Sequence, residues 1–103
     1  MNNPFGIYDK SYRLIIETIA DQNGINKVLI FGSRALGNYK KGSDIDLAIF
    51  GNAVDSNVIS NISVKINQSL PIPYKVDLVN FNDIDNKNLK EHILNEGKVF
   101  WQS

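Results

Sequence analysis

Apolar residues recur at two spacings along the chain, and their alternation predicts a succession of helices and strands. Apolar positions three and four residues apart predict a first helix that Asp9 caps at its N-terminus and a second helix over residues 54–70. A last helix is predicted to begin at Asp85 or Asn86, because both residue types commonly cap a helix N-terminus. Each predicted helix ends at residues that interrupt helices, namely Asn23-Gly24, Pro71-Ile72-Pro73 and Gly97.

Short apolar runs rich in β-branched and aromatic residues separate these helices and predict strands. The runs cover residues 27–31, 45–50, 74–81 and 99–101. The second run is apolar on both faces after Asp46, which is typical of a central strand. The connection between the first two runs is too long for a tight hairpin and has room for one helical turn from Ser33 to Leu36.

This order of elements predicts an α/β (α+β) fold in which helices pack on a sheet of mixed or antiparallel pairing. The length of 103 residues fits one small domain over residues 1–103. The hydrophobic fraction of 43% and the charged fraction of 21% are those of a globular protein and not of a disordered one.

Charge and residue usage exclude several classes of function. Lys+Arg and Asp+Glu number 11 each, so the net charge is zero and neither direct DNA binding nor membrane binding is expected. The sequence has no cysteine, which excludes disulfides, thiol catalysis and zinc–thiolate sites. No apolar run is long enough to span a bilayer, and Met1-Asn2-Asn3-Pro4 does not begin a signal peptide. A cytoplasmic location is therefore expected.

Three aspartates interrupt the apolar strands and are the candidate catalytic and metal-binding residues. Asp44 and Asp46 are two residues apart, so their side chains are expected on one face while Ile45 enters the core. Asp77 can complete a three-carboxylate cluster if the strand over residues 74–81 pairs beside the strand over residues 45–50. Carboxylate oxygens suit Mg²⁺ or Mn²⁺, and such a cluster can hold two ions. One ion would activate an attacking hydroxyl and the other would steady a leaving phosphate.

The segment before these acids is a candidate nucleotide-binding site. Gly32 allows a backbone to approach a phosphate, and Ser33 opens a possible helix whose free N–H groups favour anions. The hydroxyl of Ser33 can also donate a hydrogen bond to a phosphate oxygen. Arg34 could reach the same phosphates by a forked contact or could equally point to solvent.

Each feature also has a purely structural interpretation. A Gly-Ser pair before a helix commonly marks a turn with an N-cap, and an Asp pair commonly lies at a solvated strand end. Asp77 alone could pair with Lys75 or with a buried lysine. The structural interpretations must all hold together, and they leave the three apolar-flanked aspartates without a common reason, so we favour the metal site.

Gly32-Ser33, Asp44-Ile45-Asp46 and Asp77 together resemble the signature of the DNA polymerase β-type nucleotidyltransferase superfamily. The longer stretch GSRALGNYKKGSDIDLAIF resembles the minimal nucleotidyltransferases (MNT), which are the antitoxins of HEPN/MNT toxin–antitoxin pairs. The resemblance covers nearly the whole chain, including the tail LKEHILNEGKVFW, and implies a polymerase β-like fold with a mixed sheet packed on helices.

The resemblance also implies an activity, which is transfer of AMP from ATP to a tyrosine hydroxyl of a HEPN ribonuclease toxin with release of pyrophosphate. In this chain Gly32 and Ser33 would hold the triphosphate. Asp44 and Asp46 would ligate Mg²⁺, and Asp77 would ligate the catalytic metal and assist deprotonation of the acceptor. Relatives often carry a further acid where this chain has Asn80, so a weakened outer contact is expected there.

Two other functions stay open from the sequence. One is a non-catalytic antitoxin that neutralises the HEPN protein by binding, and the other is a small-molecule nucleotidyltransferase. Larger transferases carry an extra domain for base and acceptor, and this chain leaves no residues for one. The acceptor is therefore expected to be presented by a partner protein or by a second copy.

Overall fold

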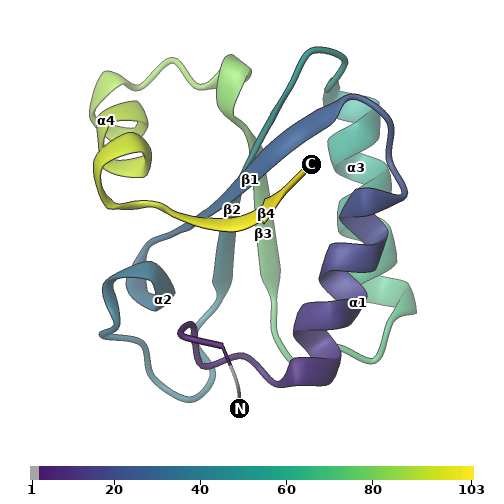
Figure 1. The fold of residues 1–103 in the computed structure, drawn as a ribbon, viewed down its shortest axis with the longest axis vertical. Helices are drawn as coiled ribbons and strands as arrows, with labels where there is room; N and C mark the ends of the chain where they lie inside the picture. The colour runs from purple at the N-terminus through teal and green to yellow at the C-terminus, as the bar shows by residue number, and fades with distance from the viewer. Residues whose placement is uncertain (1–2) are drawn as a thin grey trace.

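The computed structural model describes residues 3–103. These residues form a four-stranded sheet with helices on both faces (Figure 1). Met1 and Asn2, part of the segment interpreted as lacking a signal peptide, lie outside the described residues. The strands are β1 (Ile25–Phe31), β2 (Ile45–Gly51), β3 (Val76–Asn80) and β4 (Lys98–Gln102). The helices are α1 (Asp9–Ala20), α2 (Ser33–Leu36), α3 (Ser56–Val64), α4 (Lys87–Glu96), the π-helix η1 (Lys65–Ser69) and the 3₁₀ helix η2 (Phe81–Asp83).

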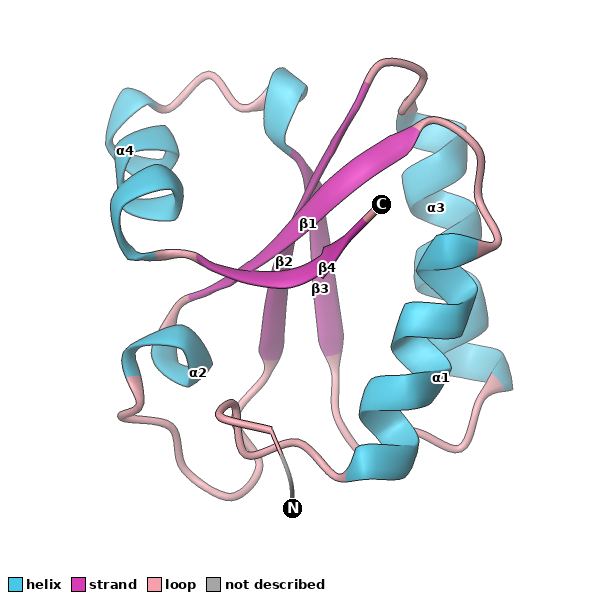
Figure 2. Cartoon of the chain, viewed as in Figure 1, coloured by secondary structure: helices cyan, strands magenta, loops and turns pink. Residues whose placement is uncertain are grey.

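The sheet is mixed, which is one of the two pairings that the sequence pattern left open and the one that the family resemblance implied. Its order is β3-β2-β1-β4, so β2 is central and β3 is an edge strand. β1 pairs antiparallel with β2 and β4, whereas β3 lies parallel to β2. The parallel pair requires a crossover, and α3 with η1 supplies it over one face of the sheet (Figure 2).

Element boundaries differ from prediction where capping or helix type changes. Asp9 is the first residue of α1 and not its cap, because Tyr8 occupies the cap position. The helix predicted over residues 54–70 is an α-helix followed by a π-helical turn. The last helix begins as expected after Asn86, whose side chain accepts a hydrogen bond from the Leu89 amide at 3.1 Å.

Alternation along β2 divides the sheet into two unlike faces. Ile45, Leu47 and Ile49 are fully buried in the large core beneath α1 and α3. Ala48 faces the opposite way, toward a small cluster beneath α4. Figure 1 shows α4 on this second face and α2 near the other end of the strands, where Ala35 of α2 packs into the large core. Asp46 lies on the second face as well, because it alternates with the buried residues.

Among the described residues, no helix combines the length and the apolar character needed to cross a bilayer.

Candidate active site

Asp46 and Asp77 lie side by side on neighbouring strands. Together with Asp44, which precedes β2, they are named the acid row. Asp46 and Asp77 are register partners in the parallel pairing of β2 and β3, and Phe31 of β1 is the partner of Asp46 on the other side. Register partners project from the same face of a sheet, so the two carboxylates lie beside each other at the start of their strands. The strand pairing that the three-carboxylate hypothesis required is thus present. Asp44 precedes β2 by one residue and is exposed.

The acids act on one another electrostatically. Burial raises the pKa of the Asp46 carboxyl above its usual value, and the charges of Asp77 and then Asp44 raise it further. Asp77 also lies 3.7 Å from the Lys75 ammonium, in a pair whose side chains are 46% and 69% exposed. An exposed ion pair of this kind contributes little stability. The structural alternative for Asp77 therefore exists, but it leaves the repulsion at Asp46 uncompensated.

Gly32 brings the backbone of the Gly-Ser turn against the acid row. Its φ of 75° lies in the region that favours glycine, and a Cβ atom added there would lie 2.7 Å from Oδ2 of Asp46. The Gly32 carbonyl accepts hydrogen bonds from the amides of Ala35 and Leu36, which closes the turn that opens α2. Ser33 follows directly and is half-buried. The two halves of the predicted site, turn and carboxylates, are adjacent.

Arg34 lies in neither of its expected positions. The side chain is buried, and its guanidinium donates to backbone carbonyl groups. Nε and Nη2 donate to the Ser43 carbonyl at 3.1 and 2.8 Å, and Nη1 donates to those of Phe5 and Gly6 at 3.0 and 3.1 Å.

These bonds join three separate segments of the chain, and the guanidinium also lies against the rings of Tyr39 and Tyr74. The expectation that Arg34 points to solvent is wrong, and a forked contact to phosphate conflicts with this use of its donors. Arg34 instead holds the loop that leads to Asp44, since Ser43 directly precedes that acid.

Asn80 does not contact the acid row. It lies three residues after Asp77 and therefore on the opposite face of β3, where its side chain is buried. Its amide donates to the Val54 carbonyl at 2.9 Å and to the Asp83 carboxylate at 3.3 Å. The expected weak outer contact at this position is wrong, because Asn80 braces the turn after β3.

His92 of α4 lies against Phe31, the register partner of Asp46 on β1. It is half-buried, and its ring meets that of Phe31 edge-on, with 6.3 Å between ring centroids. No pattern in the sequence indicates this contact, because it depends on how α4 crosses the sheet.

The donor set of the row is chemically suited to a hard divalent cation. Three carboxylates supply oxygen ligands only, and their mutual repulsion is relieved by a cation. Within residues 3–103, no group of three acidic, histidine or cysteine side chains is already arranged to hold a metal ion. Asp44, Asp46 and Asp77 remain the residues that the sequence predicts as Mg²⁺ ligands.

The sequence matches one family along most of its length. The family model described as polymerase beta, nucleotidyltransferase matches residues 14–103, which include the Gly-Ser turn and all three acids. The chain belongs to the polymerase β nucleotidyltransferase family. The chain has no match among curated proteins.

Solved structures, among them toxin–antitoxin complexes, share the fold. A toxin–antitoxin crystal structure with AMP-PNP aligns with a TM-score of 0.72 and 24% identity, over 89% of this chain and 73% of that one. A Shewanella oneidensis structure, described as a tri-AMPylated HEPN toxin in complex with MNT antitoxin, aligns with a TM-score of 0.67 and 22% identity, over 91% and 71%. A Sulfolobus solfataricus structure described as a candidate nucleotidyltransferase aligns with a TM-score of 0.57 and 20% identity, over 90% of this chain and 78% of that one. The resemblance to the minimal nucleotidyltransferases is confirmed at the level of fold.

Proposed function

We propose that this nucleotidyltransferase transfers AMP from ATP, with Mg²⁺, to a tyrosine hydroxyl of a HEPN ribonuclease toxin and thereby acts as its antitoxin. The observation that carries the proposal is the pairing of Asp46 with Asp77 beside the Gly32 turn. Support also comes from the similar structures, one with AMP-PNP and one with an AMPylated HEPN toxin.

The roles of the residues follow from their positions. Gly32 has no side chain, so its backbone can approach the triphosphate, and the Ser33 hydroxyl would donate to a phosphate oxygen. Asp44, Asp46 and Asp77 would hold Mg²⁺. When bound, this ion supplies positive charge to the triphosphate and to the attacking oxygen.

Asp77 lies on the edge strand of the sheet, and we assign it the role of deprotonating the acceptor hydroxyl. The acceptor oxygen forms a bond to the α-phosphorus as the bond from that phosphorus to the bridging oxygen breaks. Pyrophosphate leaves with the electron pair, and the Asp77 carboxylate takes the hydroxyl proton.

Transfer of label from α-³²P-ATP to a purified HEPN-domain partner tests this function. We expect labelling with Mg²⁺ that is lost with EDTA and in the Asp44→Asn/Asp46→Asn variant. Asp85→Asn is the matched control, because it removes an exposed carboxylate outside the acid row.

A stable complex with the HEPN protein but no labelling by any nucleoside triphosphate would overturn the catalytic proposal. That result would favour an antitoxin that acts by binding alone. Labelling of a small hydroxylated compound in place of the protein would favour a small-molecule transferase.

A further inference from the structure

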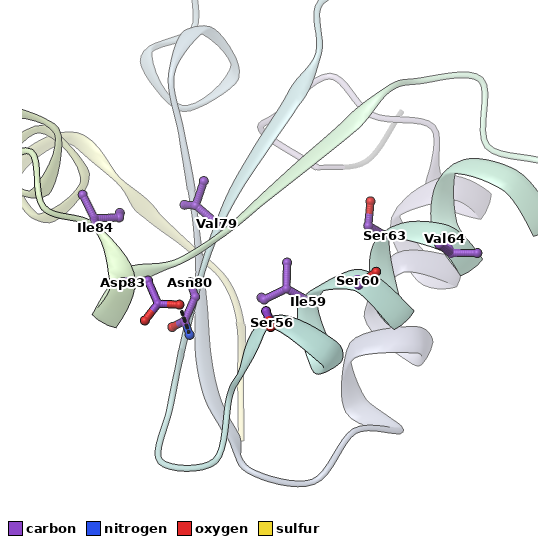
Figure 3. A pocket seen from close by; sticks show the side chains of 9 residues that line it. All are labelled: Ser56, Ile59, Ser60, Ser63, Val64, Val79, Asn80, Asp83 and Ile84. Carbon is purple, nitrogen blue, oxygen red and sulfur yellow. Dashed lines mark hydrogen bonds between the residues drawn. The ribbon is translucent and has the colours of Figure 1, made fainter.

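A groove runs along the free edge of β3, between this strand and α3. It consists of two adjoining cavities of about 490 and 670 Å³ that share Ser63 and Val79. Figure 3 shows the first cavity, with side chains of α3 on one side and those of β3 and η2 on the other. The second cavity continues along the strand to Tyr74 and is lined by Asp77. The groove therefore leads from the turn after β3 to the acid row.

The backbone of β3 offers hydrogen-bonding groups to this groove. The Lys75 carbonyl accepts a hydrogen bond from the Ile45 amide at 2.9 Å. Because every second residue of a strand pairs with the same neighbour, the backbone N–H and C=O groups of Asp77 and Val79 also point toward β2. The intervening residue Leu78 directs its N–H and C=O outward. Within the described residues these two groups have no hydrogen-bond partner.

The side chain of Asn67 pairs with Val76, the first residue of β3 whose backbone groups point away from β2. The Asn67 side-chain amide donates to the Val76 carbonyl at 3.0 Å and accepts from the Val76 amide at 3.0 Å, as a residue of a neighbouring strand would. Asn67 belongs to the π-helical turn η1, and such turns are frequent at functional sites. A strand added to this edge must therefore end beside Asn67, with its last paired residue next to Leu78.

The α3 side of the groove is lined mainly by short side chains. Ser56, Ser60 and Ser63 lie on one side of the helix at spacings of four and three residues, and their short side chains leave the strand edge accessible. Val64 adds an apolar contact and is 47% exposed. A groove between a helix and an unpaired strand edge is the arrangement that binds extended peptides by adding a strand to a sheet.

We propose that the acceptor protein docks by placing an extended segment in this groove as an additional strand on β3. The segment ends its pairing at Leu78, so one side chain on its acid face lies beside Asp77. That position would deliver the acceptor hydroxyl, and the two neighbouring residues would face α3. This inference rests on the proposed function for the chemistry, but the docking is a separate property of the groove.

Filling the groove tests the docking. Ser60→Trp places a bulky ring in the groove from an exposed position on α3, and Asn61→Trp places the same ring on α3 outside the groove lining. We expect Ser60→Trp to raise the KM for a HEPN-domain acceptor protein at least tenfold, with kcat and the Kd for ATP changed less than twofold. Asn61→Trp should change none of these by more than twofold. Equal behaviour of the two variants would overturn the proposal.

Amide hydrogen exchange measures docking without transfer. In the wild-type chain and in Asp46→Asn, we expect the Leu78 amide to exchange at least tenfold more slowly when the HEPN-domain protein is added. Unchanged exchange in a formed complex would overturn the docking, even if AMP is transferred. Slowed exchange in a complex that is never labelled would overturn the proposed function and retain the docking. Protection that rises with concentration of the chain alone would indicate pairing of two copies at this edge and would also overturn the proposal.

Discussion

Asp46 and Asp77 are register partners on adjacent parallel strands and project from the same face of the sheet. Burial is the largest cause of the raised pKa of Asp46, followed by the charges of Asp77 and Asp44. Like charges directly opposite one another on a sheet are destabilising. The chain therefore carries an unfavourable arrangement that a cation would relieve.

Removing the charge at position 46 should stabilise the protein. Because the folded-state pKa lies above the unfolded value, the folded state binds more protons between these two values, and stability falls as pH rises through that interval. The cost of the ionised carboxylate is then complete at neutral pH. Asp46→Asn should raise Tm at pH 7 by a few degrees, with little change below the unfolded pKa of Asp46.

Thermal unfolding at pH 3 and pH 7 checks this expectation, with Asp85→Asn as the control. A loss of stability in Asp46→Asn at pH 7 would show that the carboxylate makes a favourable contact there.

Addition of Mg²⁺ should stabilise the wild-type chain. A ligand that binds only the folded state adds about 1.4 kcal/mol when its concentration is about ten times its Kd. We expect Tm to rise with Mg²⁺ concentration in the wild type and to stay constant in the Asp46→Asn/Asp77→Asn variant. Scans at constant ionic strength separate binding from screening. The same rise in both proteins would exclude these carboxylates as the ligands.

The pattern of the sequence predicted the parts of the site that depend on local order. The short helix from Ser33 to Leu36 follows from one turn signal, and the central place of β2 follows from its two apolar faces. Period-two alternation fixed the face of Asp46 once Ile45 was assigned to the core. The adjacency of Asp77 stayed conditional, because strand pairing is a long-range choice that alternation alone does not determine.

Side chains whose partners are distant in sequence could not be placed in this way. Arg34 has the chemistry of a phosphate ligand, yet its acceptors include the carbonyls of Phe5 and Gly6, about 28 residues earlier. The Asn80 side chain donates to the carbonyl of Val54, which lies 26 residues earlier in the segment between β2 and α3. Residue type alone gives the bonding capacity of such groups and leaves their partners open.

Gly32 should tolerate substitution less well than Gly37 and Gly42, the two glycines of the loop between α2 and β2. Gly32→Ala combines a positive φ with a Cβ contact of 2.7 Å to Asp46, so both the turn and the carboxylate must move. Gly37→Ala has the positive φ of 84° without any atom within 4 Å, and Gly42→Ala has neither constraint. We expect about 1–2 kcal/mol of destabilisation for Gly37→Ala, more for Gly32→Ala and little for Gly42→Ala.

Urea unfolding gives the order of the three variants, and Mg²⁺-dependent labelling reports on the site. Gly32→Ala should lose labelling even where it is folded, whereas Gly37→Ala should retain it. Equal stability of Gly32→Ala and Gly42→Ala would contradict the close approach of this backbone to Asp46.

Arg34 should matter for folding and not for nucleotide affinity. Arg34→Lys keeps a charge but loses the planar fork, so buried carbonyls lose their donors at a cost of about 2–4 kcal/mol. Ser33→Ala, in contrast, removes a half-buried hydroxyl at the turn and should weaken ATP binding with a smaller effect on stability. Urea unfolding together with the Kd for ATP of the folded protein separates the two effects. If Arg34→Lys keeps wild-type stability and loses more than tenfold in ATP affinity, the guanidinium binds phosphate and its backbone contacts are secondary.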